Sequence, residues 1–226
     1  MAPSATDRNR VKAQLATTRA TLATAGIPLP WLDAEILVAH ILQSSRERLH
    51  SHPDQQLSVA QRARLRRLTS RRAARVPVPY LVGEREFYGH MLKVTPAVLI
   101  PRPSSELLVE LAIDWLKAHP ERRRVIDLGT GSGAVAISVA KAVPGVRIEA
   151  RDVSARALRV AADNIARYRL RRRITTVKAD LLKGAAPADL ILANLPYIRR
   201  RCGGCGPRSS STSRGSRSTA ARTACR

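Results

Sequence analysis

The stretch Val-Ile-Asp-Leu-Gly-Thr-Gly-Ser-Gly at residues 125–133 decides the fold that this sequence predicts. Residues 125–128 form a short apolar run with β-branched side chains, which is typical of a buried strand. Three glycines follow at alternate positions, and the Ala/Val/Ile-rich residues 134–143 indicate a helix. Glycine lets a ligand approach the backbone, because it has no Cβ and tolerates positive φ. In an open α/β sheet such a turn lies at the carboxyl ends of the strands, where ligands bind.

The glycines alone leave two interpretations open, a turn that binds a cofactor and a tight turn with a purely structural role. Polar residues at the ends of three further predicted strands favour the interpretation that the glycine turn binds a cofactor. These strands are expected at residues 146–150, 174–177 and 188–193. Asp152 follows the first of them, where a carboxylate can accept hydrogen bonds from ribose hydroxyls, although it could instead cap the next helix. Asp180 follows the second strand, and Asn194 comes directly after the third.

The residues at these four strand ends resemble those of class I S-adenosylmethionine-dependent methyltransferases. Asn-Leu-Pro-Tyr at residues 194–197 is similar to the Asn-Pro-Pro-Tyr motif of enzymes that methylate planar amide or amino nitrogens. Upstream segments narrow the resemblance to the peptide chain release factor glutamine N5-methyltransferases. Those segments are residues 25–37, 79–84, 86–89 and 99–107. The resemblance covers roughly residues 8–198.

The resemblance implies an α/β fold with an incomplete Rossmann-like methyltransferase sheet and a helical domain at the N-terminus. The expected parts are a helical substrate-binding domain at residues 1–75, a β-hairpin linker at 76–103, a partial methyltransferase domain at 104–198 and an Arg/Ser-rich tail at 199–226. Helical spacing of apolar residues supports the first part at residues 8–25, 31–43 and 58–73. Residues 46–49 are expected to be a short solvated segment, and Pro77 and Pro79 to break the third of these helices.

The activity implied by the resemblance is methyl transfer from S-adenosyl-L-methionine to the glutamine side-chain amide in the Gly-Gly-Gln loop of release factors, in translation termination. The implied catalytic residues are Asn194, Pro196 and Tyr197, and the implied substrate-binding residues are Asn194, Leu195, Pro196 and Tyr197. The cofactor-binding residues implied are Gly129, Thr130, Gly131, Ser132, Gly133, Asp152, Asp180, Leu181 and Asn194. Neither a metal ion nor a charged base is needed, since the sulfonium methyl is already a good electrophile and the enzyme has chiefly to position the amide nitrogen.

One departure from the family pattern keeps the substrate open. Leu195 stands where the motif usually has its first Pro, and Asn-Leu-Pro-Tyr also resembles the motif of rRNA adenine methyltransferases. The alternatives are therefore a nucleic-acid (rRNA or DNA) adenine N6-methyltransferase and an inactive truncated remnant.

The formal net charge of +23 invites a nucleic-acid interpretation. Subtracting the eight arginines of residues 199–226, a segment without acidic residues, leaves +15 for the rest of the chain. This charge suits work near the ribosome but does not establish it. The sequence has neither an apolar run of membrane-spanning length nor a signal peptide, so we expect a cytoplasmic protein without membrane contact. A monomer is a separate expectation, which no sequence pattern supports.

Residues 199–226 differ abruptly in composition from what precedes them. They contain no Leu, Ile, Val or aromatic residue and cannot bury enough surface to fold. All three cysteines lie there, and the Cys-x-x-Cys at Cys202 and Cys205 has neither a second pair nor a nearby His, so no metal site is predicted. We hypothesise that the reading frame shifts after Ile198, the alternative being a genuine basic tail. On that hypothesis the fourth strand becomes an exposed edge, and the chain is inactive or weakly stable.

Overall fold

The structure is a computed structural model, and it describes residues 9–195. The predictions made above for Pro196, Tyr197 and the tail at 199–226 lie outside these residues.

The N-terminal part of the described chain is helical. Its helices are α1 (Val11–Thr24), α2 (Pro30–Leu42), α3 (Arg46–Ser51), α4 (Val59–Ala73) and the short α5 (Val78–Val82). Apolar side chains from all five helices form one cluster, which includes the fully buried Val11 and Leu37. Ser58 and Gln61 form a capping box that satisfies free backbone N–H groups at the start of α4.

Two expectations for this part are only partly right. Residues 46–48 are exposed, as in a solvated segment, but they also begin α3, because Ser45 caps it through a hydrogen bond from the Arg48 N–H and Leu49 is buried in the helical cluster. α4 ends at Ala73, ahead of the prolines expected to break it, but Pro77 and Pro79 then begin the short α5, which was not predicted. Pro79 is tolerated there because residues in the first turn of a helix have no intrahelical partner for their N–H groups.

An antiparallel hairpin follows the helices, as the sequence predicts. Its strands are β1 (Glu84–Phe87) and β2 (His90–Lys93), and they pair from Glu84 with Lys93 to Phe87 with His90. Phe87 and Leu92 point into the same apolar core as the helices and strands that follow. The hairpin is therefore packed onto the second half of the chain rather than free of it.

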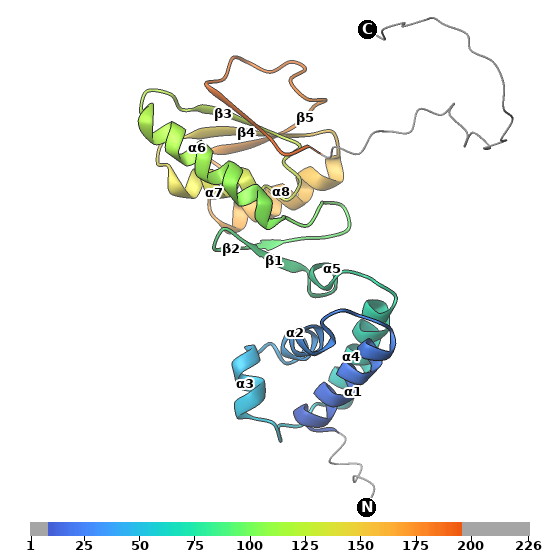
Figure 1. The fold of residues 1–226 in the computed structure, drawn as a ribbon. Helices are drawn as coiled ribbons and strands as arrows, with labels where there is room; N and C mark the ends of the chain where they lie inside the picture. The colour runs from blue at the N-terminus through green and yellow to red at the C-terminus, as the bar shows by residue number, and fades with distance from the viewer. Residues whose placement is uncertain (1–8, 196–226) are drawn as a thin grey trace, which may run out of the picture. The chain divides into compact units, whose positions relative to one another are not determined.

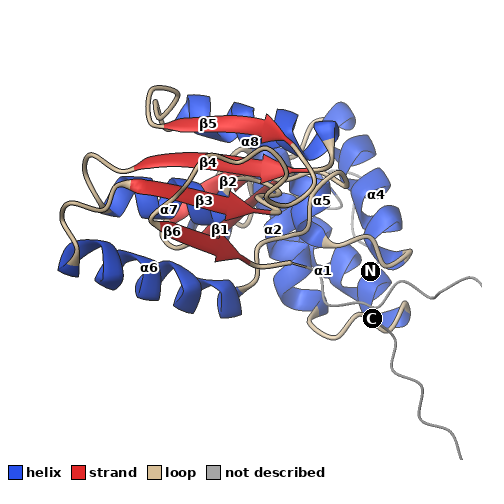
Figure 2. Cartoon of the chain, turned by 90° about the horizontal axis from the view of Figure 1, so that it is seen from above, coloured by secondary structure: helices blue, strands red, loops and turns tan. Residues whose placement is uncertain are grey.

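In the described residues after the hairpin, four strands form a parallel sheet, which confirms the α/β class. The strands are β3 (Arg124–Leu128), β4 (Arg147–Asp152), β5 (Ile174–Lys178) and β6 (Leu190–Ala193). Their order in the sheet is β5-β4-β3-β6, and Figure 2 shows all four arrowheads at the same end. Leu128 pairs with Arg151 and with Ala193, so these strands end level with one another.

Helices cover one side of this sheet. They are α6 (Glu106–Ala118), preceded by the short η2 (Pro103–Ser105), α7 (Ala134–Ala142) and α8 (Ala155–Arg167). Figure 1 shows α6, α7 and α8 on the same side of the strands, where α7 is buried almost throughout. The opposite face has a hollow of about 470 Å³ whose lining includes Ile126, Glu149 and Thr175. None of the helices in the part of the chain that the structure describes is both long enough and apolar enough to cross a membrane.

Candidate active site

The glycine turn between β3 and α7 lies at the carboxyl end of the sheet. Gly129, Gly131 and Gly133 have φ values of +66°, +56° and +80°, which side chains with a Cβ rarely adopt. The turn is joined to the neighbouring strand by a hydrogen bond of 2.9 Å from the Thr130 N–H to the Arg151 carbonyl. The glycines are thus required by the backbone conformation, and Gly129 is exposed at the edge where the strands end, whereas Gly131 is half-buried and Gly133 is buried.

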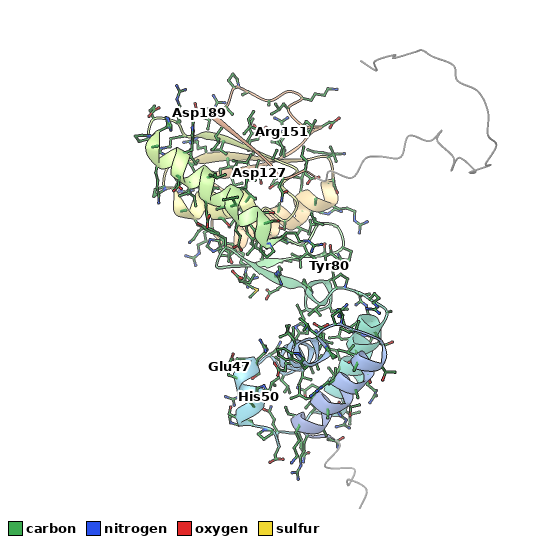
Figure 3. All side chains as sticks on the ribbon, in the orientation of Figure 1. Glu47, His50, Tyr80, Asp127, Arg151 and Asp189 are labelled. Atoms are coloured by element: carbon green, nitrogen blue, oxygen red, sulfur yellow. The ribbon has the colours of Figure 1, made fainter. Side chains whose placement is uncertain are left out.

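Asp127, near the end of β3, stabilises the first part of this turn. Its carboxylate is buried and accepts a hydrogen bond of 2.7 Å from the Thr130 hydroxyl. Burial raises the pKa of the Asp127 carboxyl from 3.8 to about 6, although hydrogen bonds from Thr130 and from the Ala136 backbone oppose this effect. The negative charge of Asp152 raises the pKa further. Figure 3 labels Asp127 on its strand within the sheet.

Asp152 secures the middle of the turn from the end of β4. One carboxylate oxygen accepts the Gly131 N–H at 3.1 Å, and the other accepts the Ser154 N–H at 2.9 Å. The N-cap of α8 is Ser154, whose hydroxyl accepts the Ala157 N–H, so Asp152 itself is not the cap. The carboxylate therefore stands directly beside the glycine turn, as a ribose-binding residue would.

Asn164 secures the last part of the turn from α8. Its Nδ2 donates to the Ser132 carbonyl at 2.9 Å and to the Lys93 carbonyl at 3.0 Å, while its Oδ1 accepts the Lys93 N–H at 2.8 Å. The side chain is 1% exposed. Asn164 is not among the site residues predicted from the sequence. The available signal was a polar residue on the apolar face of α8, between the buried Ala161 and Ile165.

Asp180 and Leu181 lie in the turn after β5. This turn is attached to β4 by the Ala179 N–H, which donates to the Asp152 carbonyl at 3.2 Å. It is attached a second time by Arg151, whose Nη2 donates to the Lys183 carbonyl at 2.5 Å and whose Nη1 pairs with Glu149 at 2.6 Å. Leu181 has a φ of +46° and its side chain is half exposed. The turn therefore presents an apolar side chain next to the strand that carries Asp152.

Asn194 lies at the same edge of the sheet, one residue after β6. Its Nδ2 donates a hydrogen bond of 2.5 Å to the hydroxyl of Ser105, a buried residue at the start of α6. Leu195 lies against the glycine turn, since a Cβ added to Gly129 would be 2.7 Å from the Leu195 Cδ2 atom. Ser105 stands at the N-cap position of α6, but its hydroxyl caps no backbone N–H of this helix and contacts Asn194 instead.

The described part of the predicted site is thus gathered at one edge. The three glycines, Asp152 and Asn194 meet within a few residues of the strand ends, and Asp180 and Leu181 follow the next strand over. Ser105, Asp127 and Asn164 are the additional side chains that hold these residues in place. An edge of exposed backbone with a carboxylate beside it and an amide opposite can hold a polar cofactor next to an amide substrate.

Two family models match this chain. The PrmC N-terminal domain matches residues 14–83, which comprise most of the helical part, and the methyltransferase small domain matches residues 103–202, which comprise the sheet. The order of these two matches along the chain is the order in which the sequence analysis placed the helical and methyltransferase parts.

Curated proteins named release factor glutamine methyltransferase are similar over most of the chain. The protein of Bordetella pertussis is 47% identical over 176 residues, which are 76% of this chain and 64% of the relative. That of Rhodopirellula baltica is 41% identical over 76% of this chain and 60% of the relative. That of Nitratidesulfovibrio vulgaris is 35% identical over 88% of this chain and 68% of the relative.

The chain spans less than two thirds of the length of the first two relatives and slightly more than two thirds of the third. The two family models and the identity over most of this chain confirm the predicted methyltransferase fold. The chain therefore belongs to the family of release factor glutamine methyltransferases.

Proposed function

We propose that this chain binds S-adenosyl-L-methionine at the glycine turn and transfers its methyl group to the side-chain amide nitrogen of a release factor glutamine, in the Gly-Gly-Gln loop. The single observation that carries the proposal is the position of Asn194. The Ser105 hydrogen bond and the contact of Leu195 with Gly129 bring Asn194 and Leu195 to the edge of the sheet that holds the glycines.

The residues at this edge fit the cofactor. A Cβ added to Gly131 would have the Gly129 carbonyl at 3.8 Å as its nearest neighbour, so the space beside this glycine is open. Each Asp152 oxygen accepts one backbone N–H and keeps a lone pair for a ribose hydroxyl. Asp180 and the exposed side chain of Leu181 would border the adenine. When bound, the cofactor supplies an electrophilic methyl group on a sulfonium.

The task left to the protein is to orient an amide nitrogen, whose lone pair is delocalised into the carbonyl. Asn194 has its Nδ2 turned to Ser105, so its Oδ1 points the other way and can accept one hydrogen of the substrate amide. The Leu195 carbonyl would accept the other hydrogen. Holding both hydrogens places the nitrogen in line with the methyl group, and positioning of this kind supplies a large part of many enzymatic rate enhancements. Pro196 and Tyr197, proposed to stiffen the loop and to flank the amide, lie outside the described residues.

The test is transfer of a labelled methyl group from S-adenosylmethionine to purified release factor, to rRNA and to duplex DNA in parallel. The Bordetella pertussis relative serves as the positive control for release factor. We expect label on the glutamine of the Gly-Gly-Gln loop and none on a release factor in which that glutamine is replaced. Label on nucleic acid would favour an adenine N6-methyltransferase, and cofactor binding without any transfer would favour an inactive remnant.

Two neighbouring serines provide a matched pair for the proposed role of Asn194. Ser105→Ala removes the hydroxyl that orients the Asn194 amide, whereas Ser104→Ala removes an exposed hydroxyl one residue away. We expect Asn194→Ala to lower transfer by about a hundredfold, as misplacement by about 1 Å does elsewhere. Ser105→Ala should lower transfer in the same direction and Ser104→Ala should leave it unchanged. Equal transfer by the Asn194→Ala variant would contradict the assignment.

We also propose a division of the chain into parts, a cellular location and an oligomeric state. The family matches at residues 14–83 and 103–202 support the proposed parts at 1–75, 76–103 and 104–198. We propose that the protein acts as a cytoplasmic monomer close to the ribosome, which its positive charge of +23 would favour. Sedimentation at two ionic strengths, with and without ribosomes, tests both the oligomeric state and the association.

A further inference from the structure

The glycine turn is held at three successive residues by side chains from three different elements. Asp127 of β3 accepts the Thr130 hydroxyl, Asp152 of β4 accepts the Gly131 N–H, and Asn164 of α8 donates to the Ser132 carbonyl. The first two come from the strands that flank the turn. The third comes from a helix and has a second function, because the same amide also binds the hairpin.

Asn164 pairs with Lys93 as a neighbouring strand would. Its Oδ1 accepts the Lys93 N–H and its Nδ2 donates to the Lys93 carbonyl, so both backbone groups of the last residue of β2 are satisfied by one side chain. The two hydrogens of Nδ2 are divided between Lys93 and Ser132. The three contacts require two N–H donors and one acceptor on a single side chain. A shorter side chain, or one that lacks the second donor or the acceptor, cannot make all three.

Other contacts join α8 to the hairpin without reaching the turn. Lys93 and Asp163 form an ion pair of 2.8 Å whose side chains are about half exposed. Arg167 and Glu84 pair at 2.7 Å, and the Tyr168 hydroxyl donates to the Met91 carbonyl at 2.9 Å. Among the described residues, Asn164 is the side chain whose hydrogen bonds connect the hairpin and the glycine turn at once.

We propose that Asn164 is a positioning residue for cofactor binding, which couples the β1–β2 hairpin to the glycine turn. It acts by fixing the direction of the Ser132 carbonyl and so the conformation of the peptide between Ser132 and Gly133. This inference rests on the proposed function, since it assumes that the turn receives the cofactor. Because the hairpin uses the same side chain, a displacement of β2 changes the shape of the turn, and cofactor binding in turn stabilises the hairpin.

The test compares variants of the full chain by titration calorimetry with S-adenosylhomocysteine and by hydrogen exchange of the Gly133 and Lys93 amides. Asn164→Asp keeps the shape but replaces both donors with a carboxylate that faces two carbonyls, and Asn164→Ala removes all three contacts. Asp163→Asn is the matched control, because it breaks the exposed link between the same two elements. Ile165→Val, a change in the buried core one residue away, controls for loss of stability alone.

We expect both Asn164 variants to raise the Kd for S-adenosylhomocysteine at least about tenfold and to speed exchange at Gly133 and Lys93, whereas both controls stay within about twofold of the wild type. If Asn164→Asp does not fold, the affinity and exchange of Asn164→Ala alone test the proposed role of Asn164. Unchanged exchange at Gly133 in the Asn164 variants, or unchanged affinity alongside a lowered Tm, would overturn the inference. Failure of the wild type to bind S-adenosylhomocysteine would instead contradict the proposed cofactor role of the glycine turn. In that case, hydrogen exchange at Gly133 and Lys93 would still show whether Asn164 couples the hairpin to the turn.

Discussion

Buried carboxylates are the most informative single residues of this site, because their ionisation reports on their surroundings. Asp127 lies under the glycine turn, where burial raises the pKa of its carboxyl to about 6. The folded chain therefore holds this proton more tightly than the unfolded chain does. The contribution to stability is complete below about pH 4 and is lost as the pH rises through about 6.

Replacing Asp127 by Asn should remove this pH dependence. A pKa shift of about two units corresponds to about 3 kcal/mol, so the wild type should lose up to that much unfolding free energy relative to Asp127→Asn between pH 4 and pH 7. Urea unfolding at several pH values measures the difference. Asp163→Asn, on the exposed side of α8, is the control and should leave the shape of the profile unchanged. Parallel profiles for the wild type and Asp127→Asn would contradict the placement of Asp127.

Alanine variants of Gly129 and Gly131 distinguish the effect of backbone strain from the effect of the contact with Leu195. Both have positive φ, so alanine at either should cost about 1–2 kcal/mol of unfolding free energy. Only at Gly129 would the added Cβ meet the tip of Leu195, a flexible side chain that can move aside. We expect the two variants to be similarly destabilised in chemical denaturation and both to lose methyl transfer. A Cβ at Gly131 enters the space proposed for the cofactor and should weaken S-adenosylhomocysteine binding, whereas a Cβ at Gly129 displaces Leu195, which follows Asn194. Unchanged transfer by Gly129→Ala would argue against the Leu195 contact.

At the scale of elements, β6 ends one residue before Asn194, and Asp189 anchors the start of this strand. The Asp189 carboxylate accepts the backbone N–H groups of Arg123 and Arg124 at 2.9 and 2.8 Å, and it also pairs with the Arg122 side chain at 3.3 Å. The backbone hydrogen bond from Arg124 is the largest of the causes that lower the pKa of the Asp189 carboxyl. Figure 3 shows Asp189 near the start of the strand that it fixes to β3.

Asp189→Ala should loosen β6 without disturbing the rest of the sheet. We expect hydrogen exchange of the amides of residues 190–193 to become severalfold faster, because the pairing with β3 loses its starting anchor, while exchange in β4 stays the same. Glu121→Ala is the control, since Glu121 is an exposed carboxylate that also pairs with Arg122. Uniformly faster exchange across the sheet would mean that Asp189 stabilises the whole unit instead.

The elements that the sequence predicted well are those whose signals are local. Apolar runs followed by Gly, Asp or Asn located all four strands to within two residues, and the parallel arrangement then required the strand ends to meet. α3 and α5 were not predicted, because one depends on the Ser45 cap and the other on prolines that suit a first turn. The contacts of Ser105 and Asn164 could not be predicted, because their partners are 89 and 71 residues away in the chain.

At the scale of the whole described unit, the sheet ends at β6 on one side. The Ile191 side chain in this edge strand is 48% exposed. An exposed edge strand with an apolar side chain invites pairing between chains.

Ile191→Lys should therefore reduce self-association, because a charged side chain on an edge strand disfavours pairing with a second edge. We expect the concentration at which light scattering rises to increase severalfold. Val59→Lys, at an exposed position on α4, removes a similar apolar side chain away from the sheet and is the control. Equal effects of the two changes would show that general solubility, and not the edge, is responsible.

The measurement that tests the central claim most directly is calorimetric titration of the chain with S-adenosylhomocysteine, for the wild type, Asp152→Ala and Asp114→Ala. Asp152 stands beside the Gly131 N–H, whereas Asp114 is exposed on α6. Hydrogen bonds to a carboxylate contribute about 1.5–3 kcal/mol each, so Asp152→Ala should weaken binding at least about tenfold. The account predicts one saturable site in the wild type, weaker binding in Asp152→Ala and unchanged binding in Asp114→Ala. Equal affinity of all three proteins, or absence of binding to the wild type, would contradict it.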